Sequence, residues 1–170
     1  MRGKELKDTS SYLDKRFEYK RGVGERRIEA NIVSNASDEV GMLIKICSKI
    51  QRNSVLEEKE KNVLSRIFSD RLERAMKIIN EDGVTRYAFK PSNRIVWGIK
   101  GRKRGYQVIP ATPYCSCDDF YFRVLGIKRG VCYHLIAQYL ASSLGKVKRI
   151  DLSDNVYDEV LVKLRPNIEE

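Results

Sequence analysis

The feature that most constrains this chain is the grouping of its metal-ligating side chains. Three of its four cysteines and its only histidine lie within residues 115–134. They form two close pairs, Cys115-Ser-Cys117 and Cys132-Tyr-His134, with fourteen residues between them. Because a chain with so few of these residues gathers them into one short segment, we expect the four side chains to act together.

The first pair fits an extended segment. In a strand, side chains two residues apart point to the same face, so Cys115 and Cys117 can reach one ion. Ser116 then points away from that ion. We expect this pair at or near the turn of a hairpin formed by residues 112–117 and 120–125.

The second pair fits the start of a helix. Residues two apart in a helix lie on nearly opposite sides, so Cys132 and His134 can share a metal only under one condition. Cys132 must precede the helix and His134 must lie in its first turn. Three thiolates and one imidazole then complete a tetrahedral set, and soft sulfur ligands favour zinc over hard cations.

Other interpretations of the cluster remain open from the residues alone. The even number of cysteines allows two disulfides, although a Cys-x-Cys disulfide is strained and a reducing compartment disfavours it. A cysteine–histidine nucleophilic pair requires a substrate pocket and an orienting third group, and nothing in the sequence points to them. His134 could also be an ordinary buried histidine.

Length and composition set the class of protein. A chain of 170 residues with 42% hydrophobic side chains can form one domain with a real core. No run approaches the ~20 apolar residues of a membrane helix, and the first residues lack the apolar segment of a secretory signal. We therefore expect a soluble, cytoplasmic protein (nuclear if the source is a eukaryote), in which closely spaced cysteines bind metal more often than they form disulfides.

The net charge of +10 is concentrated in one part of the sequence. Residues 83–150 contain thirteen lysines and arginines and two acids, which gives +11, and the remainder is close to neutral. A one-sided excess of this kind suggests a polyanion as partner. The alternative is that these charges are solvated side chains on exposed turns. The candidate contact residues lie at a turn tip, in the finger loop and after the predicted helix: Arg102, Lys103, Arg104, Lys128, Arg129, Lys146, Lys148 and Arg149.

The first half of the chain predicts helices. Residues 1–36 are dense in charges of both signs and predict a charged arm, either flexible or ordered on a partner. Apolar side chains at helical spacing then predict a helical hairpin over residues 37–82, whose second helix carries one apolar stripe. Ser54-Val-Leu-Glu57 is typical of a capping box at the start of that helix. Cys47 lies on the apolar face of the first helix, so we expect a buried thiol rather than a ligand.

The second half predicts strands and then a helix. Residues 83–150 form a basic, β-rich region in which alternating residues predict three antiparallel strands before the cysteines. A helix follows over residues 131–144, ended by Gly145, and residues 151–170 predict a short C-terminal helix and tail. The fold class is therefore α+β: an N-terminal helical hairpin, a small antiparallel sheet and a C-terminal ββα zinc finger.

The cysteine–histidine segment resembles a known family. Cys-x-Cys, a spacer and Cys-x-His are the pattern of the SWIM zinc finger, and CSCDDFYFRVL and GVCYHLIAQYLA are similar to its strand–strand–helix unit over residues 112–143. By position, the resemblance assigns one zinc ion to Cys115, Cys117, Cys132 and His134. The small size and the single C-terminal unit are similar to the SWIM proteins of the Shu complex and their archaeal relatives. Many members carry a basic residue where this chain has Tyr133, so one positive charge near the site is missing.

The resemblance implies a function. Four protein ligands leave no position for an activated water, so we expect the zinc to be structural and the chain to be no enzyme. The relatives work beside RecA-family recombinases, which implies an accessory protein of DNA recombination and repair that contacts a recombinase or its paralogue and touches single-stranded or forked DNA. The alternative is a stand-alone, sequence-tolerant nucleic-acid-binding protein. We also expect that removing the metal unfolds residues 112–143 while the helical hairpin survives.

Overall fold

The computed structural model describes residues 36–53, 55–125 and 130–165. The arm predicted for residues 1–36 lies outside this part of the chain, except for Ala36.

The described helices and strands follow in this order: α2 (Ala36–Asn53), α3 (Glu58–Phe68), α4 (Asp70–Asn80), β1 (Val84–Lys90), β2 (Ile95–Lys100), β3 (Gly105–Ile109), β4 (Tyr114–Cys115), the π-helix η1 (Phe120–Leu125), α5 (Tyr133–Ser143), β5 (Lys148–Ser153), the 3₁₀ turn η2 (Asp154–Val156) and α6 (Tyr157–Leu164). Within these residues, no helix combines the length and apolar character needed to cross a bilayer.

The predicted second helix of the hairpin is two helices. The backbone breaks at Ser69, which has a positive φ of 51° and separates α3 from α4. Leu64, Phe68 and Leu72 are nevertheless all buried, so the apolar stripe continues across the break. The apolar stripe predicts which side chains are buried, but it does not predict the change of backbone direction at Ser69.

The predicted capping box is wrong. The helix begins at Glu58, and the residue that precedes it, Glu57, makes no capping hydrogen bond with its side chain. Residues 55–57 are not helical, so Glu57 is not placed in the first turn as a capping box requires. Ser54 lies outside the described residues.

The sheet has the strand order β4-β3-β2-β1-β5. The three predicted strands are confirmed as β1, β2 and β3, which pair antiparallel. β5 was not predicted: it pairs parallel with β1, with Thr85 opposite Lys148, so the sheet is mixed rather than antiparallel. Its sequence KRIDLS is mostly exposed and polar, as an edge strand is, and therefore carries little strand signal.

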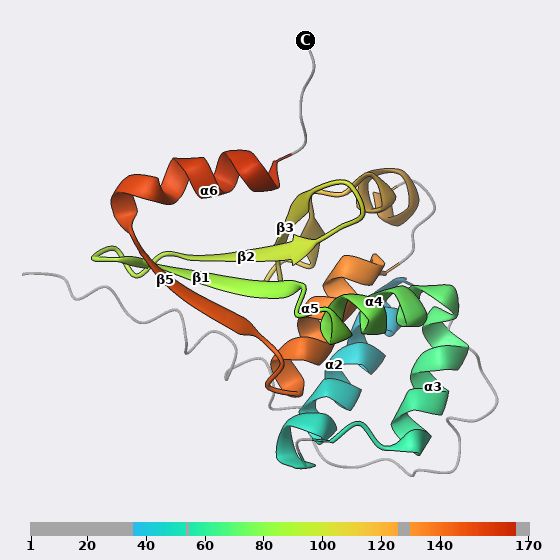
Figure 1. Cartoon of the computed structure of the whole chain (residues 1–170). Helices are drawn as coiled ribbons and strands as arrows, with labels where there is room; N and C mark the ends of the chain where they lie inside the picture. The colour runs from blue at the N-terminus through green and yellow to red at the C-terminus, as the bar shows by residue number, and fades with distance from the viewer. Residues whose placement is uncertain (1–35, 54, 126–129, 166–170) are drawn as a thin grey trace, which may run out of the picture. The chain divides into compact units, whose positions relative to one another are not determined.

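Helices cover both faces of the sheet (Figure 1). α5 lies on one face, and α6 crosses the other. Two glycines allow the close approach of α6, because a Cβ atom would lie 3.2 Å from a Leu164 methyl at Gly98 and 2.8 Å from it at Gly105. The predicted C-terminal helix is thereby confirmed and seated on the sheet, where Leu161 and Leu164 pack against Phe89.

α5 lies at the centre of the main core. Figure 1 shows it between the sheet and the first helices, and it contacts both α2 and α4. Its side chains Leu135, Ile136 and Leu140 are fully buried in the same apolar cluster as Leu43 of α2 and Leu72 of α4. α5, which carries His134, is therefore part of the predicted finger and also packs against the predicted helical hairpin. Gly145, with φ of 69°, follows the end of this helix as expected.

Candidate metal centre

The first cysteine pair is held by the β3–β4 hairpin. Cys115 lies on β4 opposite Val108, and Cys117 follows two residues later. The carbonyl of Cys117 then accepts hydrogen bonds from the N–H groups of Phe120 and Tyr121, at 3.1 and 3.2 Å. These bonds turn the chain directly into η1.

The second strand of the predicted finger hairpin is therefore wrong, because residues 120–125 form a π-helix. Their aromatic pattern was interpreted as an alternating strand. In the structure Phe120 is buried, whereas Tyr121 and Phe122 are both exposed, which is not strand alternation. The two strands of the ββα unit are β3 and β4, one strand earlier than predicted.

The second pair lies as predicted. Cys132 has extended backbone angles, φ −85° and ψ 164°, and immediately precedes α5. His134 is in the first turn of that helix. The carbonyl of Cys132 accepts the N–H of Ile136 at 3.2 Å, which fixes the start of the helix to the ligand segment.

The fold brings the two pairs together. The candidate ligand atoms of Cys115, Cys117, Cys132 and His134 all lie within 4.8 Å of one another, and all four residues are buried. Cys115 Sγ is 3.9 Å from His134 Nδ1, and a sulfur and a nitrogen ligand of a tetrahedral zinc site lie about 3.6 Å apart. All four cysteines of the chain are free thiols, so neither of the two disulfides is present.

The pKa values of the three thiols are shifted in different directions. Hydrogen bonds from Cys115 and Cys132 lower the pKa of Cys117. The reciprocal bond to Cys117 raises the pKa of Cys115, and burial raises that of Cys132. The backbone N–H of Phe120 also donates to Cys117 Sγ at 3.2 Å. A divalent cation bound by the three sulfurs would displace the thiol protons of the cluster.

The surroundings of His134 also fit a metal. Its Nε2 atom is buried and has no hydrogen-bond partner among the described residues. The rings of Tyr106 and Tyr133 lie against the imidazole, with centroids at 4.6 and 4.0 Å. The Nδ1 atom of His134 faces Cys115 Sγ, so coordination of the imidazole through Nδ1 would leave the ring proton on Nε2.

Ser116 points away from the cluster, as the spacing predicts. Its hydroxyl donates to the carbonyl of Leu164 at 2.9 Å and accepts from the N–H of Gln107 at 3.0 Å. The residue between the two cysteines therefore connects the ligand hairpin to α6.

Cys47, by contrast, is no part of the cluster. It is buried, and burial raises the pKa of its thiol to about 11. The prediction of a buried apolar thiol on the first helix is confirmed.

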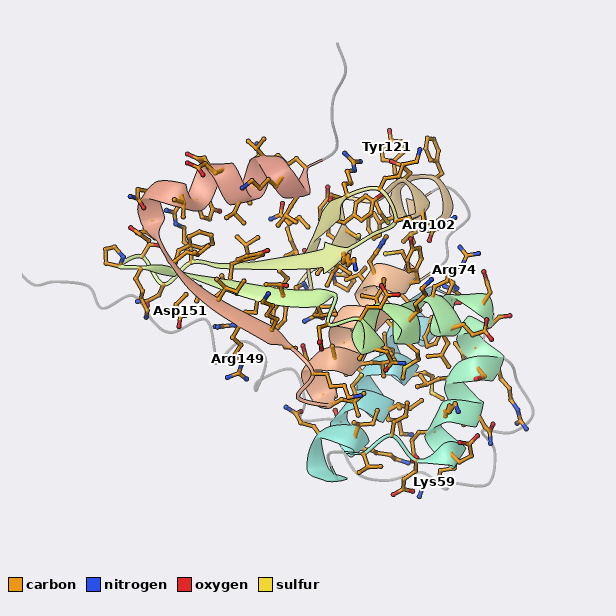
Figure 2. The ribbon with its side chains drawn as sticks, viewed as in Figure 1. Lys59, Arg74, Arg102, Tyr121, Arg149 and Asp151 are labelled. Atoms are coloured by element: carbon orange, nitrogen blue, oxygen red, sulfur yellow. The ribbon has the colours of Figure 1, made fainter. Side chains whose placement is uncertain are left out.

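The structure does not gather in one place those predicted basic residues that it describes. Arg102 and Lys103 are exposed at the β2–β3 tip, and Figure 2 shows Arg102 far from Arg149. Lys148 and Arg149 lie on β5, and Lys146 precedes that strand. Arg104 instead donates to the carbonyl of Arg165 at 3.1 Å. Lys128 and Arg129 lie outside the described residues.

A group of basic and aromatic side chains lies beside the cluster, and only Arg102 among them was predicted as a contact residue. The Arg74 guanidinium of α4 is 5.8 Å from the centre of the Tyr133 ring. Burial raises the pKa of Tyr133, and the nearby charge of Arg102 opposes this rise. Two arginines from other elements thus lie near position 133, of which Arg74 is also paired with Asp70 at 2.8 Å. Figure 2 shows Tyr121, Arg102 and Arg74 along the same side.

A buried ion pair was also missed. Arg71 of α4 and Glu39 of α2 are joined at 2.8 Å, with only 9% and 15% of their side chains exposed. A signal was present, because Arg71 occurs at helical spacing after Phe68, and Glu39 occurs four residues before Leu43. Opposite charges that each fall within an apolar stripe indicate a buried pair.

Curated relatives place the chain in a family. It is 30% identical over 124 residues to the zinc finger SWIM domain-containing protein 7 homolog of Dictyostelium discoideum. The match covers 72% of this chain and 80% of that protein. The chain belongs to this SWIM family. It is also 24% identical over 123 residues to the human zinc finger SWIM domain-containing protein 7, covering 71% of this chain and 87% of that relative.

The mouse member of the SWIM family gives a shorter match, 28% identical over 99 residues, 57% of this chain and 64% of the relative. No protein-family model matches the sequence. No solved structure matches it significantly either. The resemblance drawn from the Cys-x-Cys and Cys-x-His pattern is confirmed by these relatives, and the buried Cys₃His cluster is consistent with the zinc finger in their names.

Proposed function

We propose that this chain is a noncatalytic SWIM protein in which Cys115, Cys117, Cys132 and His134 bind one structural Zn²⁺. The observation that carries the proposal is the convergence of four buried ligand atoms within 4.8 Å. When bound, the ion supplies a fixed tetrahedral junction. The chain's own residues fill all four positions, and no position remains for a reacting water.

Elemental analysis of the purified full chain tests the metal assignment. We expect about one equivalent of zinc per chain, and three thiols protected from alkylation until a chelator is added. A zinc content far below one equivalent, with the cluster thiols alkylated in the folded protein, would reject it.

The biological role that we propose is that of an accessory protein in DNA recombination and repair, in contact with a RecA-family recombinase or a paralogue. Membership of the SWIM family and the resemblance to Shu-complex proteins support this role. Purification of the tagged chain from its source cell, followed by mass spectrometry, tests it. Recovery of a RecA-family protein is expected, and its reproducible absence would reject this partner.

A second candidate is a stand-alone nucleic-acid-binding protein. The observation that favours it is the exposed aromatic pair Tyr121 and Phe122, 66% and 68% exposed, whose rings pack edge to face at 5.3 Å. Aromatic faces can stack on unpaired bases, while guanidinium groups such as that of Arg102 neutralise phosphates. Fluorescence anisotropy with single-stranded and duplex DNA at two salt concentrations tests it. Affinity that falls as salt rises is expected, and no measurable binding would exclude this candidate.

A further inference from the structure

The buried pair of Glu39 and Arg71 makes two parallel contacts. Arg71 Nη2 is 2.8 Å from Glu39 Oε1, and Nη1 is 3.0 Å from Oε2. This is the bidentate geometry that planar guanidinium and carboxylate groups favour. The pair joins α4 to α2 within the helical part of the chain.

Both members of the pair also bind the backbone that leads to Cys132. Arg71 Nη1 donates to the carbonyl of Val131 at 2.7 Å. The N–H of Gly130 donates to Glu39 Oε2 at 3.1 Å. Two consecutive residues immediately before a candidate ligand are therefore held by one ion pair from two helices.

Helix packing alone does not explain this arrangement. The cost of removing two charges from water offsets most of the attraction within a buried ion pair, and apolar side chains of similar volume stabilise such sites equally well. Apolar side chains could not, however, bond the N–H of Gly130 or the carbonyl of Val131. The hydrogen bonds to this backbone are what the charged pair specifically supplies.

The ligand that follows needs this support. Cys132 can face the cluster only from an extended backbone ahead of α5, as its angles show. Gly130, Val131 and Cys132 are buried, so an error in their placement would move the sulfur directly. Cys115 is held separately, by the pairing of β4 with β3, so the Cys132 segment depends on its own attachment.

We propose that Glu39 and Arg71 are positioning residues for the metal centre, which hold Gly130 and Val131 so that Cys132 Sγ faces the ion. This inference rests on the zinc site proposed above. Groups behind the ligands that orient them typically change metal affinity 10- to 100-fold when removed.

The test uses the full chain and four variants. Arg71→Met removes one charge, and the double variant Glu39→Met/Arg71→Met removes both while keeping apolar volume between α2 and α4. Arg71→Lys keeps the positive charge but lacks the two Nη groups with which the guanidinium donates its hydrogen bonds. Arg66→Met, an exposed arginine of α3, is the matched control. For each we would measure the Zn²⁺ dissociation constant by chelator competition, the visible spectrum of the Co²⁺ form, and urea unfolding of the metal-free chain.

We expect the double variant to bind Zn²⁺ about 10- to 100-fold more weakly, with an altered Co²⁺ spectrum, while its metal-free unfolding transition stays close to that of the parent chain. Arg71→Lys should recover part of the affinity, and Arg66→Met should change nothing.

Parent-like zinc affinity and Co²⁺ spectrum in the double variant would overturn the inference. So would a loss of affinity matched by an equal loss of metal-free stability in both the double variant and Arg71→Lys, since this is the result of a purely structural role. A parent chain that binds no zinc would instead reject the proposed function, and this inference with it.

Discussion

The hydroxyl of Ser116 donates a hydrogen bond to the carbonyl oxygen of Leu164, at 2.9 Å. This bond connects the residue between two candidate ligands to the last residue of α6. The same hydroxyl accepts the N–H of Gln107 on β3. The hairpin that carries the cysteines is thereby fixed on its outer side by a helix that contributes no ligand.

Replacing Ser116 with alanine should lower the free energy of unfolding of the zinc-loaded chain by about 1–3 kcal/mol, because the N–H of Gln107 and the carbonyl of Leu164 lose a buried partner. Urea denaturation measures the change. The control is Ser65→Ala on the exposed face of α3, where we expect a change within about 0.5 kcal/mol. Equal effects of the two substitutions would show that the Ser116 bonds contribute nothing specific.

Removing the metal should release part of the finger. Chelation or Cys117→Ser should expose β4 and η1 to hydrogen exchange, because the cysteines lose the ion that joins them. The C-terminal half of α5 should keep its protection, since Leu140 is fully buried against the helical part of the chain. Hydrogen exchange with mass spectrometry resolves these segments. Loss of protection throughout α5 would support the earlier expectation that residues 112–143 unfold as one unit.

The buried thiol of Cys47 should make stability depend on alkaline pH. Its pKa is raised by burial from 9.0 to about 11, so between these values the unfolded chain releases the proton while the folded chain keeps it. The unfolded state then binds fewer protons, and stability falls as pH rises, by about 3 kcal/mol in total. Below pH 9 the effect is absent.

Comparison with Cys47→Ala isolates this effect, because every other titrating group is common to both chains. Urea unfolding at pH 8, 9.5 and 10.5 should show a difference between the two chains that changes in favour of the alanine variant as pH rises. Parallel pH profiles would contradict the expectation.

The exposed aromatic pair should matter for nucleic-acid binding and little for folding. Tyr121→Ala/Phe122→Ala should weaken binding of single-stranded DNA at least about fivefold, since base–aromatic stacking contributes roughly 1–3 kcal/mol per base. Val162→Ala is the matched control, because Val162 is also 68% exposed but lies on α6. Anisotropy titrations of both variants would show whether DNA binding depends on the aromatic pair or equally on the surface of α6. Unchanged binding by the aromatic variant would remove this pair from the proposed interface.

The placement of the candidate ligands could be predicted because spacing and backbone geometry restrict it. Cys-x-Cys requires an extended segment, and Cys132 and His134 can converge only across a helix start. The conformation of residues 120–125 could not be predicted, because adjacent aromatic residues occur in strands as readily as in short helical turns. The π-helix depends on the carbonyl of Cys117 and on which ring is buried against the cluster. β5 was not predicted, because an exposed edge strand needs few apolar residues and its sequence therefore lacks a clear alternating apolar pattern.

The Glu39–Arg71 pair shows a different limit. Each residue interrupts an apolar stripe, which indicates burial. The target of the pair is the backbone of residues 130–131, and that backbone has no side-chain signature. A contact from a side chain to a distant peptide group cannot be predicted from the pattern of residue types in the sequence.

The parallel pairing of β5 with β1 has a consequence for synthesis on the ribosome. All four candidate ligands have emerged once residue 134 has left the exit tunnel, whereas the strand that pairs with Thr85–Lys90 begins only at Lys148. The nascent chain can therefore capture its ion while one edge of β1 is still bare. An unpaired edge of this kind can recruit foreign strands, so the interval between metal capture and arrival of β5 is when a stalled chain is most prone to aggregate.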